Sequence, residues 1–128
     1  MSYVVDQSLA EFGRSIGIDG LTFNEHGVVS LKFELLGGLY LEKAESDCVL
    51  VYLVRELDRP SREIFAAALD LCHWRHNHPF AVNASLRDDA NLVFSVKLTQ
   101  EEFSVPTLEQ LLQFLGHVHD QAREGVIA

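Results

Sequence analysis

Apolar residues at helical spacing predict a helix near each end of the chain. The first is expected over residues 6–17, and its apolar stripe consists of Val5, Leu9, Phe12 and Ile16. The last is expected to begin at Thr107, because Thr107 and Gln110 form a capping box directly after Pro106. Its buried face is expected to consist of Leu108, Leu111, Leu112, Leu115, Val118 and Ala122.

A third helix is expected in the middle of the chain. Asp58 is placed to cap its first turn, where Pro60 is tolerated, and Pro79 ends it. Its apolar positions cover a wider arc than one buried stripe needs. They are Ile64, Phe65, Ala68, Leu69, Leu71 and Cys72.

The pattern of apolar and polar residues predicts three strands before this middle helix, the second of them short. Residues 28–35 alternate strictly, which is typical of a strand with one buried face. The apolar positions of that face are Val29, Leu31, Phe33 and Leu35. Gly37-Gly38 then interrupts the chain before a short segment at 39–42, and the turn at 45–47 leads into residues 48–55.

The segment 48–55 is apolar on both of its faces. One face carries Cys48, Leu50, Tyr52 and Val54, and the other carries Val49, Val51 and Leu53. A strand of this kind needs cover on both sides, whereas one layer of helices covers only one. Because burial of roughly 100 Å² of apolar surface is worth about 2–3 kcal/mol, we expect a second polypeptide to cover the other face.

The remaining segments complete the expected fold. Residues 80–86 and 92–98 read as a hairpin around a turn at 87–91. The order α-β-β-β-α-β-β-α predicts an α+β fold in which helices pack a mainly antiparallel sheet. A length of 128 residues suits one domain over residues 1–128.

Composition narrows the classes of partner. The formal net charge of −9 repels phosphate backbones and anionic lipid, and the ten Lys and Arg are scattered, so we expect neither nucleic acid nor membrane as a partner. No stretch approaches the roughly 20 apolar residues of a membrane span, and the amino terminus has no targeting signal. Cys48 and Cys72 lie in apolar contexts, which favours reduced thiols and a cytoplasmic protein.

The histidines near Cys72 are the best candidate for hidden chemistry. His73, His76 and His78 suggest a metal site, but no second cluster of Cys or His completes a set of four ligands. Cys72 and His73 diverge by about 100° on a helix, so they do not form a nucleophile and base. No phosphate-loop, dinucleotide or Gly-x-Ser-x-Gly pattern occurs. We therefore expect no catalytic site, no metal and no cofactor.

Several short segments, taken in order, resemble one known family. They are LAEFG (9–13), IGI (16–18), LTFNEHG (21–27), the strand at 28–34, LYLE (39–42), VLVYL (49–53), the hairpin at 83–98, Phe103 and the helix at 108–122. Their order resembles the class I type III secretion chaperones, also called the Tir-chaperone or CesT-like family. One segment departs from the pattern: CHWRHNHP (72–79) stands where the family often has a small, Gly-rich link.

The resemblance implies a cytoplasmic homodimer that binds the amino-terminal segment of an effector protein. The bound effector would be kept soluble and secretion-competent without ATP. The residues expected at the dimer interface are Phe65, Leu69, Cys72 and Trp74. The residues expected to contact the effector are Leu9, Phe12, Ile16, Leu31, Phe33, Leu50 and Tyr52.

Two other functions stay open at this point. A YbjN-like regulatory or adaptor domain resembles these chaperones in element order, and it would bind folded partners. A small enzyme or metal-binding domain is the third hypothesis.

Overall fold

The computed structural model describes residues 3–59 and 61–127. The elements follow the order expected from the sequence, with one additional 3₁₀ turn. They are α1 (Tyr3–Ser15), β1 (Val28–Phe33), β2 (Gly37–Ala44), β3 (Cys48–Glu56), α2 (Arg62–Leu71), η1 (Trp74–His76), β4 (Val82–Arg87), β5 (Asn91–Thr99) and α3 (Val105–Ile127).

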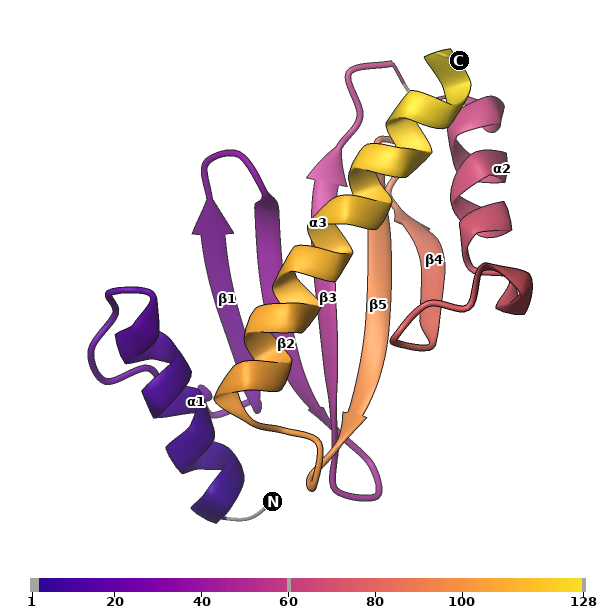
Figure 1. The fold of residues 1–128 in the computed structure, drawn as a ribbon. Coiled ribbons are helices and arrows are strands. Elements are labelled where there is room, and N and C mark those ends of the chain that lie inside the picture. The colour runs from indigo at the N-terminus through magenta and orange to yellow at the C-terminus, as the bar shows by residue number, and fades with distance from the viewer. Residues whose placement is uncertain (1–2, 60, 128) are drawn as a thin grey trace.

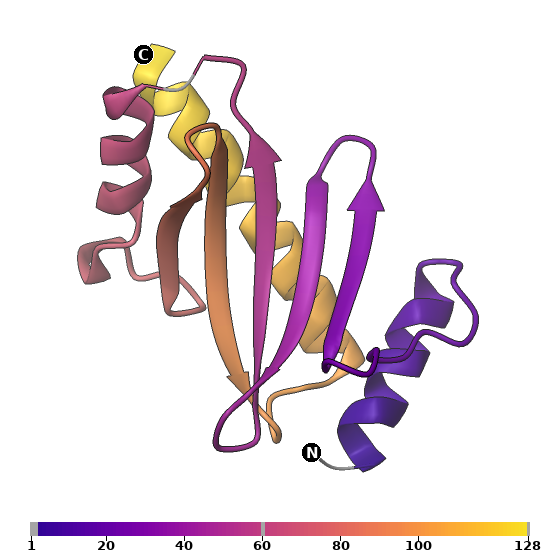
Figure 2. The same ribbon diagram turned by 180° about the vertical axis from the view of Figure 1, so that it is seen from behind.

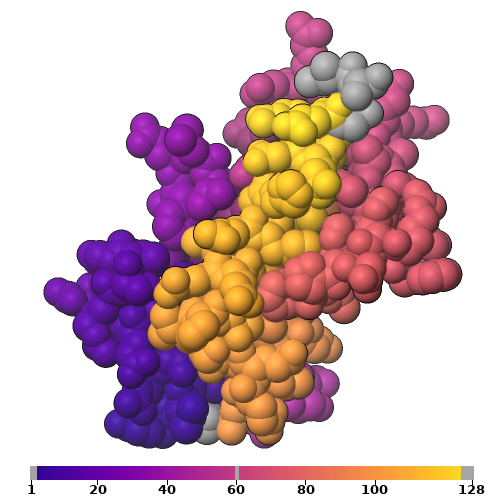
Figure 3. All heavy atoms as spheres, in the orientation of Figure 1, coloured from indigo at the N-terminus to yellow at the C-terminus, as the bar shows by residue number. Residues whose placement is uncertain are grey.

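The five strands form one antiparallel sheet in the order β1-β2-β3-β5-β4. α3 crosses one face of this sheet, while α1 lies beyond the β1 edge and α2 beyond the β4 edge (Figure 1). In the space-filling view, α3 sits between the atoms of α1 and α2 on that side (Figure 3). Among the described residues, no helix lies on the opposite face (Figure 2). The sheet therefore has one covered face and one open face.

The core lies between the sheet and α3. Val49, Val51 and Leu53 of β3 are buried against it, as are Leu111 and Leu115 of α3. Burial of each such side chain contributes about 1.5–3 kcal/mol. The helical spacing of the apolar residues in α3 and the alternation in β3 are both confirmed, because those residues face each other here.

Both expected helix caps are wrong by about three residues. The N-cap of α2 is Ser61, whose Oγ accepts a hydrogen bond from the Ile64 amide at 3.2 Å, and Asp58 lies in the preceding loop. Pro60 lies outside the described residues. α3 begins before Thr107, whose amide donates to Ser104 Oγ at 3.3 Å. In each case the amide belongs to the first turn of the helix and has no backbone partner there, and the serine hydroxyl three residues earlier accepts its hydrogen bond.

The turn between β1 and β2 differs from the expectation. Leu35 is 92% exposed in the turn and does not extend the buried face of β1. Gly37 and Gly38 belong to β2 and do not interrupt it. At Gly37 the backbone has a φ of +117°, and a Cβ atom there would lie 2.4 Å from the carbonyl oxygen of Val54. The glycine therefore allows β2 to lie close to the end of β3.

α2 ends well before Pro79. Its last residue is Leu71 and its C-cap is Cys72, after which η1 forms a separate turn closed by Asn77 in the left-handed region at a φ of 50°. The segment that departs from the family pattern thus builds a projecting corner next to β4. Over residues 3–59 and 61–127, every helix is too short or too polar to cross a bilayer.

Candidate protein-binding surfaces

The side chains of the sheet that point away from α3 form the first candidate surface, called the open face. Its apolar stripe runs mainly along β3, with one tyrosine from β2. All four residues of this stripe are half-buried in the isolated chain: Tyr40, Leu50, Tyr52 and Val54. The two-sided apolar pattern of β3 is confirmed, and no helix in the described part of the chain covers the second side (Figure 2).

Polar partners hold the aromatic pair of this stripe in place. The rings of Tyr40 and Tyr52 stack with centroids 5.1 Å apart. The hydroxyl of Tyr52 donates to Glu42 Oε2 at 3.3 Å, and burial followed by the negative charge of Glu42 raises the pKa of Tyr52. The guanidinium of Arg87 lies 5.3 Å from the centroid of the Tyr40 ring, and its hydrogen bond lowers the pKa of Tyr40. The stripe is thus a preformed surface with fixed rings.

Large apolar side chains are also exposed on α2, η1 and β4. The exposed fraction is 50% for Leu69, 85% for Trp74 and 41% for Leu86. Phe65 is half-buried and lines a hollow together with Leu86. We call this surface, made of Phe65, Leu69, Trp74 and Leu86, the α2–β4 edge. β4 is also the last strand of the sheet, so its outer backbone groups have no neighbouring strand.

The histidines after α2 support the corner built by η1. His78 Nε2 lies 2.9 Å from the Leu71 carbonyl oxygen, and its ring stacks on His76 with centroids 5.6 Å apart. Asp70 pairs with Arg75 and lies 3.4 Å from His76 Nε2. In the described part of the chain, no three His, Cys, Asp or Glu side chains gather as a metal site would require.

Cys72 has the environment of an inert thiol. Its Sγ lies 3.4 Å from the Ala68 carbonyl oxygen, and burial raises the pKa of the thiol. Because the thiolate is the reactive form, this environment weakens Cys72 as a nucleophile.

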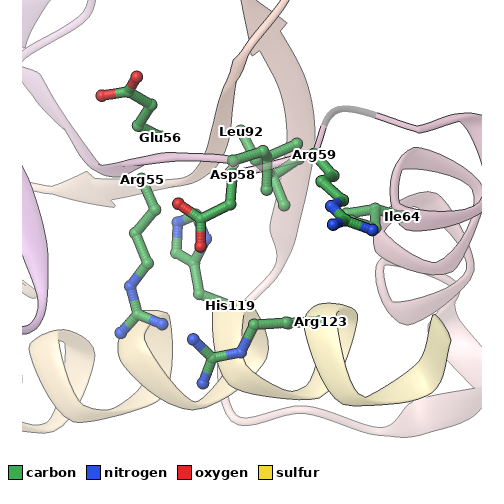
Figure 4. Close-up of a pocket in the computed structure, with 9 residues that line it drawn as sticks. Arg55, Glu56, Asp58, Arg59, Ile64, Leu92, His119 and Arg123 are labelled. Atoms are coloured by element: carbon green, nitrogen blue, oxygen red, sulfur yellow. The ribbon is translucent and has the colours of Figure 1, made fainter. Parts of the chain in front are cut away.

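A hollow of about 450 Å³ lies between the end of β3, α2 and α3 (Figure 4). His119 contributes to its wall, with Nε2 2.8 Å from the Leu53 carbonyl oxygen. The guanidinium of Arg55 donates to Asp120 Oδ1 at 2.7 Å and to the Leu36 carbonyl oxygen at 2.6 Å, and Arg123 lies 3.5 Å from the same carboxylate. Arg55 therefore joins α3 to the sheet and to the β1–β2 turn, whereas the pair of Arg123 and Asp120 lies within α3.

The structure separates the residues expected to contact an effector into three groups. Leu9 and Phe12 are 0% and 1% exposed, because the stripe of α1 packs into the core, so they are not available as surface contacts. Ile16, Leu31 and Phe33 are half-buried against the core, and Leu50 and Tyr52 lie on the open face. Helical spacing identified the apolar side of α1 but not what covers it.

The surface residues that sequence reasoning missed are Tyr40, Val54, Leu86 and Arg87. Val54 was placed on the correct face of β3 but was not named as a contact. The stacking of Tyr40 on Tyr52 follows from a strand register that pairs the two residues directly. A prediction of that register would have found Tyr40, whereas no local signal indicates that Arg87 reaches over β2.

A comparison with protein families supports the first of the three hypotheses. The family model of the type III secretory system chaperone SycN matches residues 4–123. The chain belongs to this family. The resemblance to type III secretion chaperones is therefore confirmed over nearly the whole sequence. A search of curated proteins found no match to this chaperone.

Solved structures confirm the α+β fold of this type III secretion chaperone. A chain in the crystal structure of the ExsC–ExsE complex is similar with a TM-score of 0.75, 23% identity and 96% of each chain covered. The Yersinia pestis type III secretion chaperone SycH, in complex with a stable fragment of YscM2, is similar with a TM-score of 0.68 and 16% identity. The match covers 94% of this chain and 98% of that one. YbjN from E. coli is similar with a TM-score of 0.54 and 14% identity, over 91% of this chain and 86% of that one.

Proposed function

We propose that this chaperone acts as a cytoplasmic homodimer that binds the amino-terminal segment of an effector. It keeps that segment soluble and secretion-competent without ATP, and it carries out no catalysis. Residues 1–128 act as one domain in this role. The observation that carries the proposal is the open face, where Leu50, Tyr52 and Val54 are only half-buried while the residues on the other side of β3 are fully packed. The neighbours in complex with ExsE and with a YscM2 fragment support it.

The α2–β4 edge is the proposed dimer interface. Leu69 and Trp74 protrude there, with Phe65 and Leu86 beside them, and Cys72 lies half-buried just behind. Large aromatic and aliphatic groups of this kind are typical anchors of interfaces between proteins. A two-fold axis through this edge would pair the surface with its own copy, as closed dimers require.

Effector contacts are proposed on Ile16, Leu31, Phe33, Leu50 and Tyr52, with Tyr40 and Val54 added from the structure. Leu9 and Phe12 are left out because both support the core. An effector segment that becomes ordered on binding loses conformational entropy, so a large contact area must offset that cost. Leu31 and Phe33 face the α3 side and the other strand residues face the open side, so the two faces of the sheet together would supply such an area.

The test is co-expression with amino-terminal fragments of candidate effectors. We expect light scattering to give a mass near twice 14.4 kDa for the chaperone alone, and stable co-purification with one fragment. The variant Leu50→Asp should lose most of that fragment, because it places a charge in the apolar stripe. Gln113→Asp, at an exposed position of α3, is the matched control and should retain it. A monomer that captures no fragment contradicts the proposal.

The similarity to YbjN keeps a regulatory or adaptor domain as the second candidate function. A domain of that kind would bind folded partners. Limited proteolysis of the complex separates the two functions, because a chaperone protects an effector fragment that is degraded when alone. Protection confined to a globular domain of the partner would favour the adaptor.

A further inference from the structure

Trp74 is the only tryptophan of the chain, and it projects from the corner that residues 72–79 build. It is 85% exposed, and its ring contacts the ring of His73 at a centroid distance of 5.3 Å. Within the described residues, its indole N–H has no hydrogen-bond partner. A tryptophan in a stable environment buries most of its ring and finds an acceptor for its N–H. The corner therefore presents Trp74 to a second molecule.

A hollow of about 240 Å³ has the lining that an indole requires. Leu57, Phe65 and Leu86 supply its apolar groups, and Ser61, Arg62 and Asp89 supply its polar groups. The face of an indole packs on apolar side chains and on a guanidinium, and a carboxylate accepts a hydrogen bond from its N–H. With one cation and one carboxylate, the lining is balanced in charge. The hollow therefore suits a large, neutral side chain that carries one donor.

Trp74 and this hollow lie at opposite ends of one helix. Ser61, in the lining, is the N-cap of α2, whereas Trp74 follows the C-cap, Cys72. α2 has ten residues. At the helical rise of 1.5 Å per residue, its two ends are about 15 Å apart. Trp74 therefore does not reach the hollow of its own chain.

A second copy of the chain brings an anchor and a hollow together. A two-fold axis that runs across α2 reverses the partner's helix, so the carboxyl end of one α2 lies beside the amino end of the other. Leu69 is 50% exposed and lies midway, four residues after Phe65 and five before Trp74. Residues four apart share one side of a helix, so Phe65 and Leu69 face the same way. With the axis at Leu69, each Trp74 meets the partner's hollow.

Charge favours this antiparallel pairing over a parallel one. A parallel pair would place Arg62 opposite the partner's Arg62 and would align the two helix dipoles, and both effects are repulsive. An antiparallel pair places Arg62 beside the partner's Trp74, where a cation–π contact stabilises both groups. Arg75, the neighbour of Trp74, is already paired with Asp70 and adds no net charge to the contact.

We propose that two copies pair through antiparallel α2 helices, and that Trp74 of each copy fills the hollow of the other between Phe65 and Leu86. A tryptophan buries about 150–250 Å², a large share of the roughly 800 Å² that each partner buries in a standard interface. The inference rests on the proposed function for the existence of the dimer. It adds the pair of groups by which the chain selects its own copy, and that anchor belongs to the segment that departs from the family pattern.

Because Trp74 is the only tryptophan, the indole fluorescence of the chain reports on this anchor alone. As the protein is concentrated, the emission maximum should move to shorter wavelength in step with the dimer mass measured by sedimentation. Trp74→Ala should weaken dimerisation at least about a hundredfold, because the loss of an anchor acts twice. Tyr3→Ala, which removes a ring that is 78% exposed on α1, is the matched control and should dimerise normally. A dimer with the Trp74 emission of the monomer overturns the inference.

A mixture of two variants tests the reciprocal pairing. Trp74→Ala keeps the hollow but lacks the anchor, whereas Leu86→Glu keeps the anchor but places a charge in the hollow. A mixed dimer restores one of the two contacts, so native mass spectrometry should find more of it than the half expected from random pairing. Leu86→Gln takes the place of Leu86→Glu if that variant fails to fold. Random pairing of the two variants overturns the inference, because it shows that Trp74 does not meet the hollow.

The outcomes separate this inference from the proposed function. If the unmodified chain is a dimer and Trp74→Ala dimerises as well as Tyr3→Ala does, the dimer stands and the anchor is wrong. If the chain pairs through Trp74 but captures no effector fragment, the anchor stands and the effector role is wrong. If the unmodified chain stays monomeric at every concentration, the proposed dimer is wrong and the anchor with it.

Discussion

His119 shows how one buried residue links α3 to the sheet. It is 3% exposed, its Nε2 lies 2.8 Å from the Leu53 carbonyl oxygen, and its ring meets the edge of Phe94 at a centroid distance of 4.8 Å. Burial lowers the pKa of His119 to about 4, from an ordinary value of 6.5. The imidazole is therefore neutral in the folded chain at pH 7, and it donates to the carbonyl.

This shift predicts a loss of stability in mild acid. Between pH 6.5 and 4 the unfolded chain binds a proton at His119 that the folded chain excludes, so the free energy of unfolding falls as the pH falls through this window. The full effect is about 3 kcal/mol. Urea unfolding at several pH values should show a flatter profile for His119→Gln than for the unmodified chain. His117→Gln, at an exposed position of the same helix, should leave the profile unchanged.

Two glycines offer a matched pair of substitutions. Both Gly37 and Gly20 have positive φ values, +117° and +72°, but a Cβ atom meets the Val54 carbonyl oxygen only at Gly37. Gly20→Ala should cost about 1 kcal/mol of unfolding free energy from backbone strain alone. Gly37→Ala adds the clash and should cost clearly more, measured by urea unfolding. Equal losses would show that β2 and β3 separate easily at this point.

At the scale of elements, α2 is the helix held least by burial against the rest of the fold. Ala68 is its buried residue within the described chain, and Leu69 points to solvent. Local interactions therefore matter more for α2 than for α3. The hydroxyl of Ser61 provides one of them, through the 3.2 Å hydrogen bond from the Ile64 amide.

Removal of that cap should loosen α2 selectively. Ser61→Ala should cost about 1 kcal/mol, because the first-turn amide loses its acceptor. Hydrogen exchange should quicken at the amides of α2 while those of β3 stay protected. Asp58→Ala is the control, since Asp58 lies in the loop outside the helix. An equal effect of Asp58→Ala would restore the cap expected from the sequence.

The sequence predicted elements well and their surroundings less well. Alternation along β3 placed Val49 and Leu50 on opposite faces correctly, because strand geometry alone dictates it. The stripe of α1 gave Phe12 the right side of its helix but the wrong role, since burial depends on what α3 and the sheet contribute. Helix starts were missed because several side chains at each start are able to cap, and only tertiary geometry selects one.

At the scale of the whole molecule, the two candidate surfaces lie on different parts of the fold. The open face is the exposed side of the sheet, and the α2–β4 edge lies at its β4 end (Figure 2). A dimer through the edge would leave both open faces uncovered for a client. One chain is therefore able to use its two apolar surfaces at once.

Because the two surfaces are separate, we expect that a substitution in the α2–β4 edge breaks the dimer without damage to the open face. In a two-fold dimer each substitution acts twice, and burial of one leucine is worth about 1.5–3 kcal/mol, so Leu69→Asp should weaken dimerisation at least roughly a hundredfold. Sedimentation across a range of concentrations measures the change. Leu35→Asp is the matched control, because Leu35 is more exposed than Leu69 but lies in the β1–β2 turn. If both variants dimerise like the unmodified chain, the interface lies elsewhere. If only Leu69→Asp is monomeric and it still captures an effector fragment, the two surfaces act independently.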